Sequence, residues 1–329
     1  MNKKYIIALI VAGVMIIGGF CFLKMRTGSL KQTLKKVEAY TDYQLVCDME
    51  MLENDELKSY QVTSSYASID QKDYYKVELY DKSLNQSQVI VKNETGVFVL
   101  TPSLNQAFQF QSEWPNNSSK PYIYQSLVSF LKDNKSEKVK DGYIVSGEMS
   151  YENDDRVQSQ EIKFDKQLNP EYVIVYDGEG TEIIKLTVSS FKANQKMDKK
   201  DFNQENIMNE SQSQYKSAAS SLPLYPVALM GSTLENEKVS TIHETTNHIL
   251  KFTGDKAYTI VESAISSKEN MEVIKVENEL IDLIDGFAYE SDNQMTYVSS
   301  GIVCSIYSND LTKKEMLSVL SSMQSANVK

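Results

Sequence analysis

The chain has 329 residues, of which 41% are hydrophobic and 24% are charged, so it is long enough to form two domains with separate cores. Its net charge of −11 and isoelectric point near 4.9 would repel a phosphate backbone, because proteins bind nucleic acid through clustered Lys and Arg. We therefore exclude nucleic acid as a partner.

The first 28 residues have the pattern of a membrane segment. Tyr5–Leu23 is uncharged and largely apolar, with Lys3 before it and Lys24 after it. As a helix it would be about 28 Å long, close to the hydrocarbon thickness of a bilayer. We expect an uncleaved anchor over residues 1–28. Two alternatives stay open: a cleaved signal peptide, although no small-x-small site follows the apolar run, and lipidation at Cys21, although bulky Phe20 precedes it.

The expected orientation of this anchor depends on the length of the chain beyond it. The basic residues on the C-terminal side of the apolar run outnumber those before it, and the positive-inside rule would keep that side in the cytoplasm. Long domains, however, translocate largely regardless of charge. We therefore expect a single-pass protein of the cell membrane with an extracytoplasmic ectodomain.

Periodicity then predicts a short helix followed by many strands. Ser29–Tyr40 places apolar residues at helical spacing, and apolar residues alternate with polar ones from Tyr43 to Met51, as in a half-buried strand. The same alternation predicts further strands over 58–67, 74–80, 88–92, 96–101, 106–111, 142–151, 160–164, 172–176 and 182–191. Turn residues separate these strands, so we predict an antiparallel meander with one wet face. The segment Pro121–Asp133 interrupts them with apolar residues at every fourth position, which predicts a helix against the apolar face of the sheet.

A polar segment divides the rest of the chain. Residues 195–221 lose apolar periodicity and are rich in Asn, Gln and Ser, which is typical of a linker. Beyond it we predict strands over 232–242, 248–253, 257–265, 271–276 and 301–307, and a last helix that opens with the capping box of Thr312 and Glu315. The predicted class is mainly β (α+β), with a larger domain over 29–194 and a smaller α+β domain over 222–329.

No motif in the chain supports catalysis or metal binding. His243 and His248 are the only histidines, and their spacing of five rather than four residues places them on different faces of a helix or strand. Cys47 and Cys304 each lie in an apolar strand pattern, where a buried free thiol is the commoner outcome. We therefore predict no catalytic residues, no metal site and no cofactor.

The most unusual local feature is a cluster of aromatic residues. The chain has 20 Tyr and 11 Phe, and five aromatic side chains fall close together: Phe108, Phe110, Trp114, Tyr122 and Tyr124. Such a group can line an apolar groove or anchor an interface, and these residues are the candidate binding site. The alternative is that they only pack the helix onto the sheet.

The segment Asn105–Leu127, the Asp177-Gly178 hairpin and the strand Ile183–Phe191 carry a family resemblance. Together they look like the LolA-like lipoprotein-sorting fold, and specifically its GerS-type germination lipoproteins of sporulating bacteria. The match covers residues 30–194, and the tail from Leu222 resembles the second domain of RseB/MucB-type regulators. The resemblance implies an incomplete antiparallel β-barrel over helices, whose concave face holds acyl chains in the true carriers. It also implies a noncatalytic partner of a spore-cortex amidase.

Two functions are therefore expected. The first is a membrane-anchored, noncatalytic binding protein of the cell or spore envelope, a partner or regulator of a cell-wall amidase in sporulation and germination. The alternative is a carrier or sensor that binds lipid or lipoprotein acyl chains in the concave face. An uncleaved anchor prevents shuttling, so we favour the first. An exposed strand edge could also pair two copies into a homodimer.

Overall fold

The computed structural model describes residues 30–53, 56–115, 120–151, 153–212, 222–242, 245–265 and 270–325. The predicted anchor and Cys21 lie outside these residues. Within the described part of the chain, no helix is long and apolar enough to cross a membrane. The first described element is a helix over residues 30–37, where an amphipathic helix was expected.

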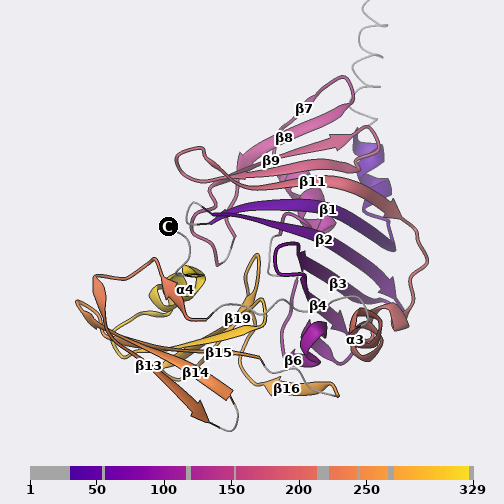
Figure 1. Cartoon of the computed structure of the whole chain (residues 1–329). Coiled ribbons are helices and arrows are strands. Elements are labelled where there is room, and N and C mark those ends of the chain that lie inside the picture. Colours follow the sequence, from indigo (N-terminus) through magenta and orange to yellow (C-terminus); the bar gives the residue numbers. More distant parts are fainter. Residues whose placement is uncertain are drawn as a thin grey trace, which may run out of the picture.

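A twelve-stranded open sheet dominates the molecule (Figure 1). Its strands are β1 (Asp42–Glu53), β2 (Glu56–Ile69), β3 (Lys72–Asp81), β4 (Gln86–Asn93), β5 (Gly96–Thr101), β6 (Gln106–Phe110), β7 (Ser136–Lys138), β8 (Gly142–Glu148), β9 (Ser159–Asp165), β10 (Pro170–Tyr176), β11 (Glu182–Ala193) and β16 (Glu272–Val276). The spatial order is β16-β6-β5-β4-β3-β2-β1-β11-β10-β9-β8-β7. The two outer strands do not pair with each other, and every neighbouring pair except β16 with β6 is antiparallel. The predicted meander is confirmed.

Alternation along β1 decides which side of the sheet becomes the inner face. Tyr43, Leu45, Cys47, Met49 and Met51 are each at most 1% exposed, and the residues between them are more exposed. Because side chains of a strand alternate between faces, these five lie on one side. The pattern read from the sequence therefore sets the register of the sheet.

Helix α2 (Tyr124–Asp133) covers this inner face, within the range predicted for a helix. It buries Tyr124, Leu127, Val128, Phe130 and Leu131, which belong to the same apolar cluster as the inner residues of β1. The short helix η1 (Pro102–Leu104) joins β5 to β6.

The outer face of the sheet is covered in part by a segment that the sequence predicted to be linker. Residues of η2 (Lys199–Phe202) and α3 (Gln204–Gln212) pack there, with Phe202, Ile207 and Met208 buried. Asp198 and Asp201 form a capping box at the start of η2. The first half of the range 195–221 is thus ordered against the sheet. Its few apolar residues are too sparse to give a periodic signal, which is why the sequence pattern missed them.

A second, seven-stranded sheet forms the C-terminal unit, in the order β13-β14-β15-β20-β19-β18-β17. Its strands are β13 (Ser232–Ile242), β14 (Thr245–Gly254), β15 (Tyr258–Ala264), β17 (Ile281–Asp282), β18 (Phe287–Ser291), β19 (Gln294–Ser299) and β20 (Ile302–Tyr307). Helix α4 (Lys313–Ser321) packs on it, and the predicted capping box of Thr312 and Glu315 is present. Strands β12 (Leu224–Pro226) and β21 (Met323–Ser325) form a separate antiparallel pair.

Strand β16 joins the two units. The sequence assigned its residues to the smaller domain, but β16 pairs in parallel with β6 at the edge of the large sheet. A pattern of alternating residues predicts a strand but does not predict which strand it pairs with, so this pairing could not be predicted from the sequence.

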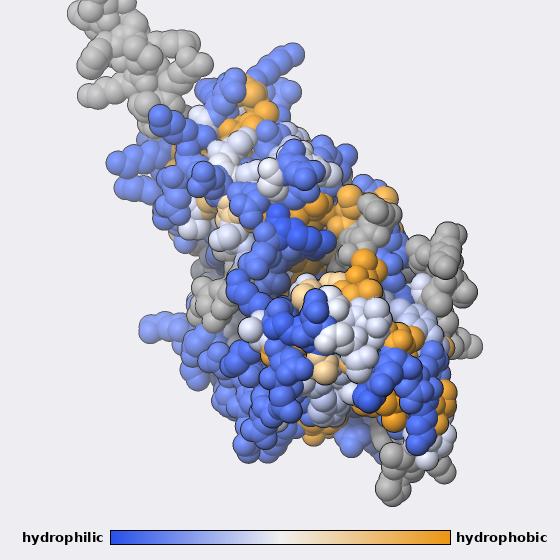
Figure 2. All heavy atoms as spheres, turned by 90° about the vertical axis from the view of Figure 1, so that its left-hand side faces the viewer, coloured by the Kyte–Doolittle hydropathy of each residue, from blue (hydrophilic) through white to orange (hydrophobic). Residues whose placement is uncertain are grey.

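Exposed apolar side chains gather in the C-terminal unit. Figure 2 shows hydrophobic patches among hydrophilic side chains on the side of the molecule where β13, β14 and α4 lie. Val227, Leu229, Leu234 and Val239 are the exposed large apolar residues of this unit before β14.

Candidate binding groove

The five aromatic residues predicted as a binding site all lie in the interior. Their exposed fractions are 3% for Phe108, 0% for Phe110, 2% for Trp114, 1% for Tyr122 and 2% for Tyr124, and all belong to the main apolar cluster. Within this cluster Trp114 contacts Tyr75 and Tyr124 contacts Tyr43. The rings of all five predicted residues are covered by the chain itself, so a role in binding an outside ligand stays a prediction.

Two of these residues hold the C-terminal unit against the large sheet. The ring centroids of Phe108 and Phe110 lie 5.1 Å and 5.6 Å from that of Phe287, and both contacts are edge-on. Phe287 lies on β18 and is fully buried. Edge-on aromatic pairs add about 1 kcal/mol beyond the area that they bury. The aromatic segment therefore anchors an interface, and this interface is internal to the chain.

A buried ion pair lies in the same interface. Lys120 Nζ lies 3.4 Å from Asp282 Oδ2, and the side chains are 4% and 6% exposed. Trp114 Nε1 also donates to Asp282 Oδ2, at 2.8 Å. Nearby, Lys58 Nζ donates to Asp285 Oδ2 at 2.9 Å, and this lysine holds the pKa of the Asp285 carboxyl below its usual range against the effect of burial. Sequence reasoning missed these residues, because Lys and Asp side chains are normally exposed to solvent.

Tyrosines form a row across the inner face. Tyr43, Tyr66 and Tyr75 lie opposite one another on β1, β2 and β3. The Tyr43 hydroxyl donates to Gln125 Oε1 at 2.6 Å and accepts from the backbone N–H of Tyr124 at 3.2 Å. The start of α2 is therefore fixed to this row by hydrogen bonds.

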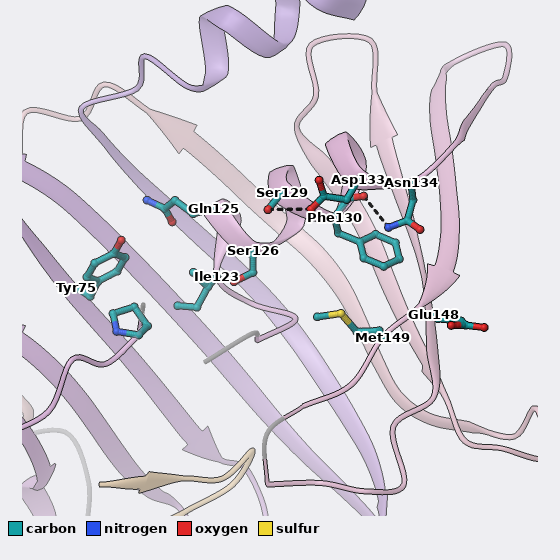
Figure 3. Close-up of a pocket in the computed structure, with 11 residues that line it drawn as sticks. Tyr75, Ile123, Gln125, Ser126, Ser129, Phe130, Asp133, Asn134, Glu148 and Met149 are labelled. Carbon is teal, nitrogen blue, oxygen red and sulfur yellow. Dashed lines mark hydrogen bonds between the residues drawn. The ribbon is translucent and has the colours of Figure 1, made fainter. Parts of the chain in front are cut away.

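Beside α2 the inner face keeps an open groove of about 470 Å³ (Figure 3). Its described lining residues come from β3, from α2 and its flanks, and from the end of β8: Tyr75, Pro115, Ile123, Gln125, Ser126, Ser129, Phe130, Asp133, Asn134, Glu148 and Met149. We call this hollow the α2 groove. It mixes apolar side chains with hydroxyl, amide and carboxylate groups, and no sequence motif indicated it.

Helix α2 also borders a smaller hollow of about 220 Å³, which we call the tyrosine hollow. Its lining includes Tyr40, Tyr43, Tyr66 and Tyr124, and it shares Gln125 and Ser129 with the α2 groove. Burial raises the pKa of Tyr66 to about 12 and that of Tyr43 further. These hydroxyls are therefore neutral at physiological pH and act as hydrogen-bonding groups.

The rim of the α2 groove is acidic. Asp133 and Glu148 are exposed, and the Ser129 hydroxyl donates to Asp133 Oδ2 at 3.4 Å. No Lys or Arg is among the described residues that line this groove. Lys132, which lines the tyrosine hollow, pairs with Glu38 at 2.7 Å. The described lining of the α2 groove therefore carries two carboxylates and no basic side chain.

The candidate catalytic and metal-binding residues do not form a site in the described part of the chain. Burial raises the pKa of the Cys47 thiol to about 12, which keeps it protonated and unreactive. Cys304 is also a buried free thiol. His248 lies on β14, and His243 falls outside the described residues. Among the residues that the structure describes, no three His, Cys, Asp or Glu side chains group as metal ligands.

Comparison with known proteins finds a relative that is similar over the whole chain. No protein-family profile matches it. It is 29% identical to "Sporulation protein YdcC" of Bacillus subtilis (strain 168), over 100% of this chain and 99% of that protein. The sporulation part of the predicted resemblance is thus supported, whereas the GerS-type assignment stays a prediction.

Solved structures give weaker likenesses. MucB is 11% identical with a TM-score of 0.33, over 90% of this chain and 96% of that one. The structure of the MucA/MucB complex of Pseudomonas aeruginosa is 10% identical with a TM-score of 0.32, over 90% of this chain and 97% of that one. A putative outer membrane lipoprotein-sorting protein domain from Vibrio parahaemolyticus is 13% identical with a TM-score of 0.31, over 55% of this chain and 97% of that one. At these TM-scores the likenesses carry no argument about this chain.

Proposed function

We propose that the chain is a noncatalytic binding protein of sporulation whose large domain holds a segment of an envelope protein in the α2 groove, with a cell-wall amidase of the spore cortex as the candidate partner. The observation that carries this proposal is the mixed lining of the groove. A role in sporulation is supported by the similarity of the full chain to the sporulation protein of Bacillus subtilis named above.

A peptide segment suits the α2 groove better than an acyl chain does. Gln125, Ser126, Ser129 and Asn134 present amide and hydroxyl groups beside the apolar surface of Met149. Gln125, Ser129 and Asn134 each already make one hydrogen bond within the chain. An acyl chain would offer no partner to their remaining donor and acceptor sites, at a cost of about 1–3 kcal/mol for each site that it buries unpaired. A peptide offers backbone donors and acceptors in addition to apolar side chains.

The charge of the groove restricts the partner segment further. With Asp133 and Glu148 at the rim and no basic residue among the described lining, an acidic segment would be repelled. The complementary segment is uncharged or basic.

Capture from sporulating cells tests this function. Full-length tagged chain is compared with Ser126→Trp, which fills the α2 groove, and with Ser318→Trp, which places the same side chain on the exposed surface of α4. We expect a cell-wall amidase among the proteins captured by the wild type and by Ser318→Trp, and at least a tenfold loss with Ser126→Trp. Equal capture by all three chains would remove the groove from the proposal.

The tyrosine hollow supports a second candidate, the binding of an acyl chain. It is smaller, and four tyrosine rings supply much of its lining. Native mass spectrometry of the chain from sporulating cells tests it, and the recovery of protein free of acyl species would exclude it.

We further propose that Tyr5–Leu23 anchors the chain with its folded part outside the cytoplasm. The apolar run in the sequence supports this placement. Protease added to intact protoplasts should digest the folded part of the chain. If the folded part is digested only after the protoplasts are lysed, it faces the cytoplasm and the proposed orientation is wrong.

A further inference from the structure

The core of the C-terminal unit contains a carboxyl group that the binding function does not use. Glu262 lies in the middle of β15 and is 0% exposed. Its Oε2 accepts one hydrogen bond, from the backbone N–H of Leu224 at 2.9 Å, and its Oε1 has no partner among the residues that the structure describes. A buried carboxyl with one donor and no cation is costly in its ionised form.

In the described structure Glu262 forms no ion pair with a Lys or Arg side chain. On the neighbouring strands its cross-strand partners are His248 of β14 and Cys304 of β20. The Nδ1 atom of His248 is also buried without a partner, and Cys304 is 1% exposed. From β13, Glu237 adds a second negative charge, and its carboxylate accepts from the Tyr225 hydroxyl at 2.9 Å.

The element that covers Glu262 is thin. Leu224 is the first residue of β12, a strand of three residues whose one partner in the described part of the chain is β21. We call this strand pair the terminal clasp. Helix α4 turns apolar residues, Met316, Val319 and Leu320, toward the same core and adds no charge to it.

We propose that Glu262 is a proton-operated latch: while its carboxyl is neutral the terminal clasp stays closed over the second sheet, and ionisation opens the clasp, because the cost of burying the charge exceeds the gain from a stronger hydrogen bond with Leu224. Ionisation places a charge beneath β12. Moving this strand lets water reach the charge without breaking the seven-stranded sheet. Consistent with this geometry, burial raises the pKa of Glu262 to about 7; the hydrogen bond from Leu224 opposes this rise and the charge of Glu237 adds to it.

Hydrogen exchange of the full-length chain tests the latch. Backbone amide protection of residues 222–228 and 320–325 is measured by mass spectrometry between pH 5.5 and 8.5, with correction for the intrinsic pH dependence of exchange. We expect protection of the clasp to fall at least tenfold across pH 7 in the wild type, while that of β1 stays constant. Protection of the clasp that does not depend on pH would overturn the proposal.

Two variants separate the latch from general loosening. Glu262→Gln keeps an acceptor for Leu224 but cannot ionise, so its clasp should stay protected up to pH 8.5. Tyr225→Phe removes the hydrogen bond from a clasp residue to Glu237 of β13 but keeps the Glu262 carboxyl. Its transition near pH 7 should therefore persist. If Glu262→Gln loses protection over the same range as the wild type, another group is responsible and the inference is wrong.

Discussion

At the scale of single residues, the buried pair of Lys120 and Asp282 gives a sharp prediction. Removing one partner of a buried ion pair leaves the other charge uncompensated and typically costs 3–5 kcal/mol. Lys120→Met should therefore lower the free energy of unfolding by about 3 kcal/mol, as measured by urea denaturation of the full chain. The pair is 3.4 Å apart and almost fully buried, so solvent does not screen it.

The double variant Lys120→Met/Asp282→Asn is the control. It removes both charges, so it should recover a substantial part of the lost stability. If the double variant is as unstable as the sum of the two single variants, the two side chains are not coupled and the assignment of this pair as the stabilising contact is wrong.

Glu262 gives the second prediction at this scale, on the pH dependence of stability. Its pKa is raised from 4.5 to about 7 in the folded chain, so between these values the folded state binds more protons than the unfolded state. The free energy of unfolding should therefore fall as pH rises from about 4.5 to 7, by up to about 3 kcal/mol. Urea denaturation at pH 5 and pH 8 measures this difference.

Glu262→Gln should flatten this dependence and be more stable than the wild type at pH 8. Glu182→Gln, which changes an exposed glutamate of β11, should leave the dependence intact. A wild type that is equally stable at pH 5 and pH 8 would contradict the prediction.

At the scale of elements, the capping box of α4 gives a prediction that sequence and structure share. The Thr312 hydroxyl accepts from the backbone N–H of Glu315, and Glu315 Oε2 accepts from the backbone N–H of Thr312 at 2.8 Å. Thr312→Ala should lower the unfolding free energy by about 1 kcal/mol in urea denaturation, whereas Thr312→Ser should stay near the wild type. Equal loss in both variants would mean that the methyl group of Thr312, rather than its hydroxyl, matters.

The same scale shows how far the sequence could predict the fold. Apolar residues alternate with polar residues along β1, and turn residues with a positive φ, such as Gly96, mark the hairpins. The positions of strands in the large sheet were therefore predictable from the sequence. Strands β17, β18 and β19 were missed. In β19 the consecutive residues from Met295 to Val298 are all buried, so the strand lacks the alternation that predicts a half-buried strand.

The predicted aromatic residues and the α2 groove do not coincide: none of the five lines the groove, although Tyr124 lines the tyrosine hollow beside it. Phe108 and Phe110 stand out in the sequence, and the structure shows that they face Phe287. The α2 groove is built from Ser, Gln and Asn side chains of α2 and its C-terminal flank together with residues of β3 and β8, which are distant in the sequence. Its existence depends on how the sheet curves around the helix, and a single sequence does not contain that geometry.

At the scale of the whole molecule, the sequence predicted two domains joined by a linker, and the structure adds close contacts between the two units. Strand β16 extends the large sheet, Phe287 packs against β6, and Lys120 forms an ion pair with Asp282. This interface resembles a protein core more than a surface between independent domains. We expect a single thermal unfolding transition for the full chain in calorimetry, and two separate transitions would show that the units unfold independently.

Removal of the C-terminal unit tests more directly whether the large sheet depends on that unit. A chain that ends at residue 221 loses β16 and Phe287, so it exposes the edge of β6 together with Phe108 and Phe110. An uncovered edge strand with apolar side chains is prone to pair with other copies. The shortened chain should therefore bind a hydrophobic dye and form large oligomers in size-exclusion chromatography, whereas Phe108→Ser/Phe110→Ser in the same shortened chain should reduce both effects. A shortened chain that stays monomeric and well folded would mean that the large sheet is complete without β16, and the two units would then be separate domains in contact.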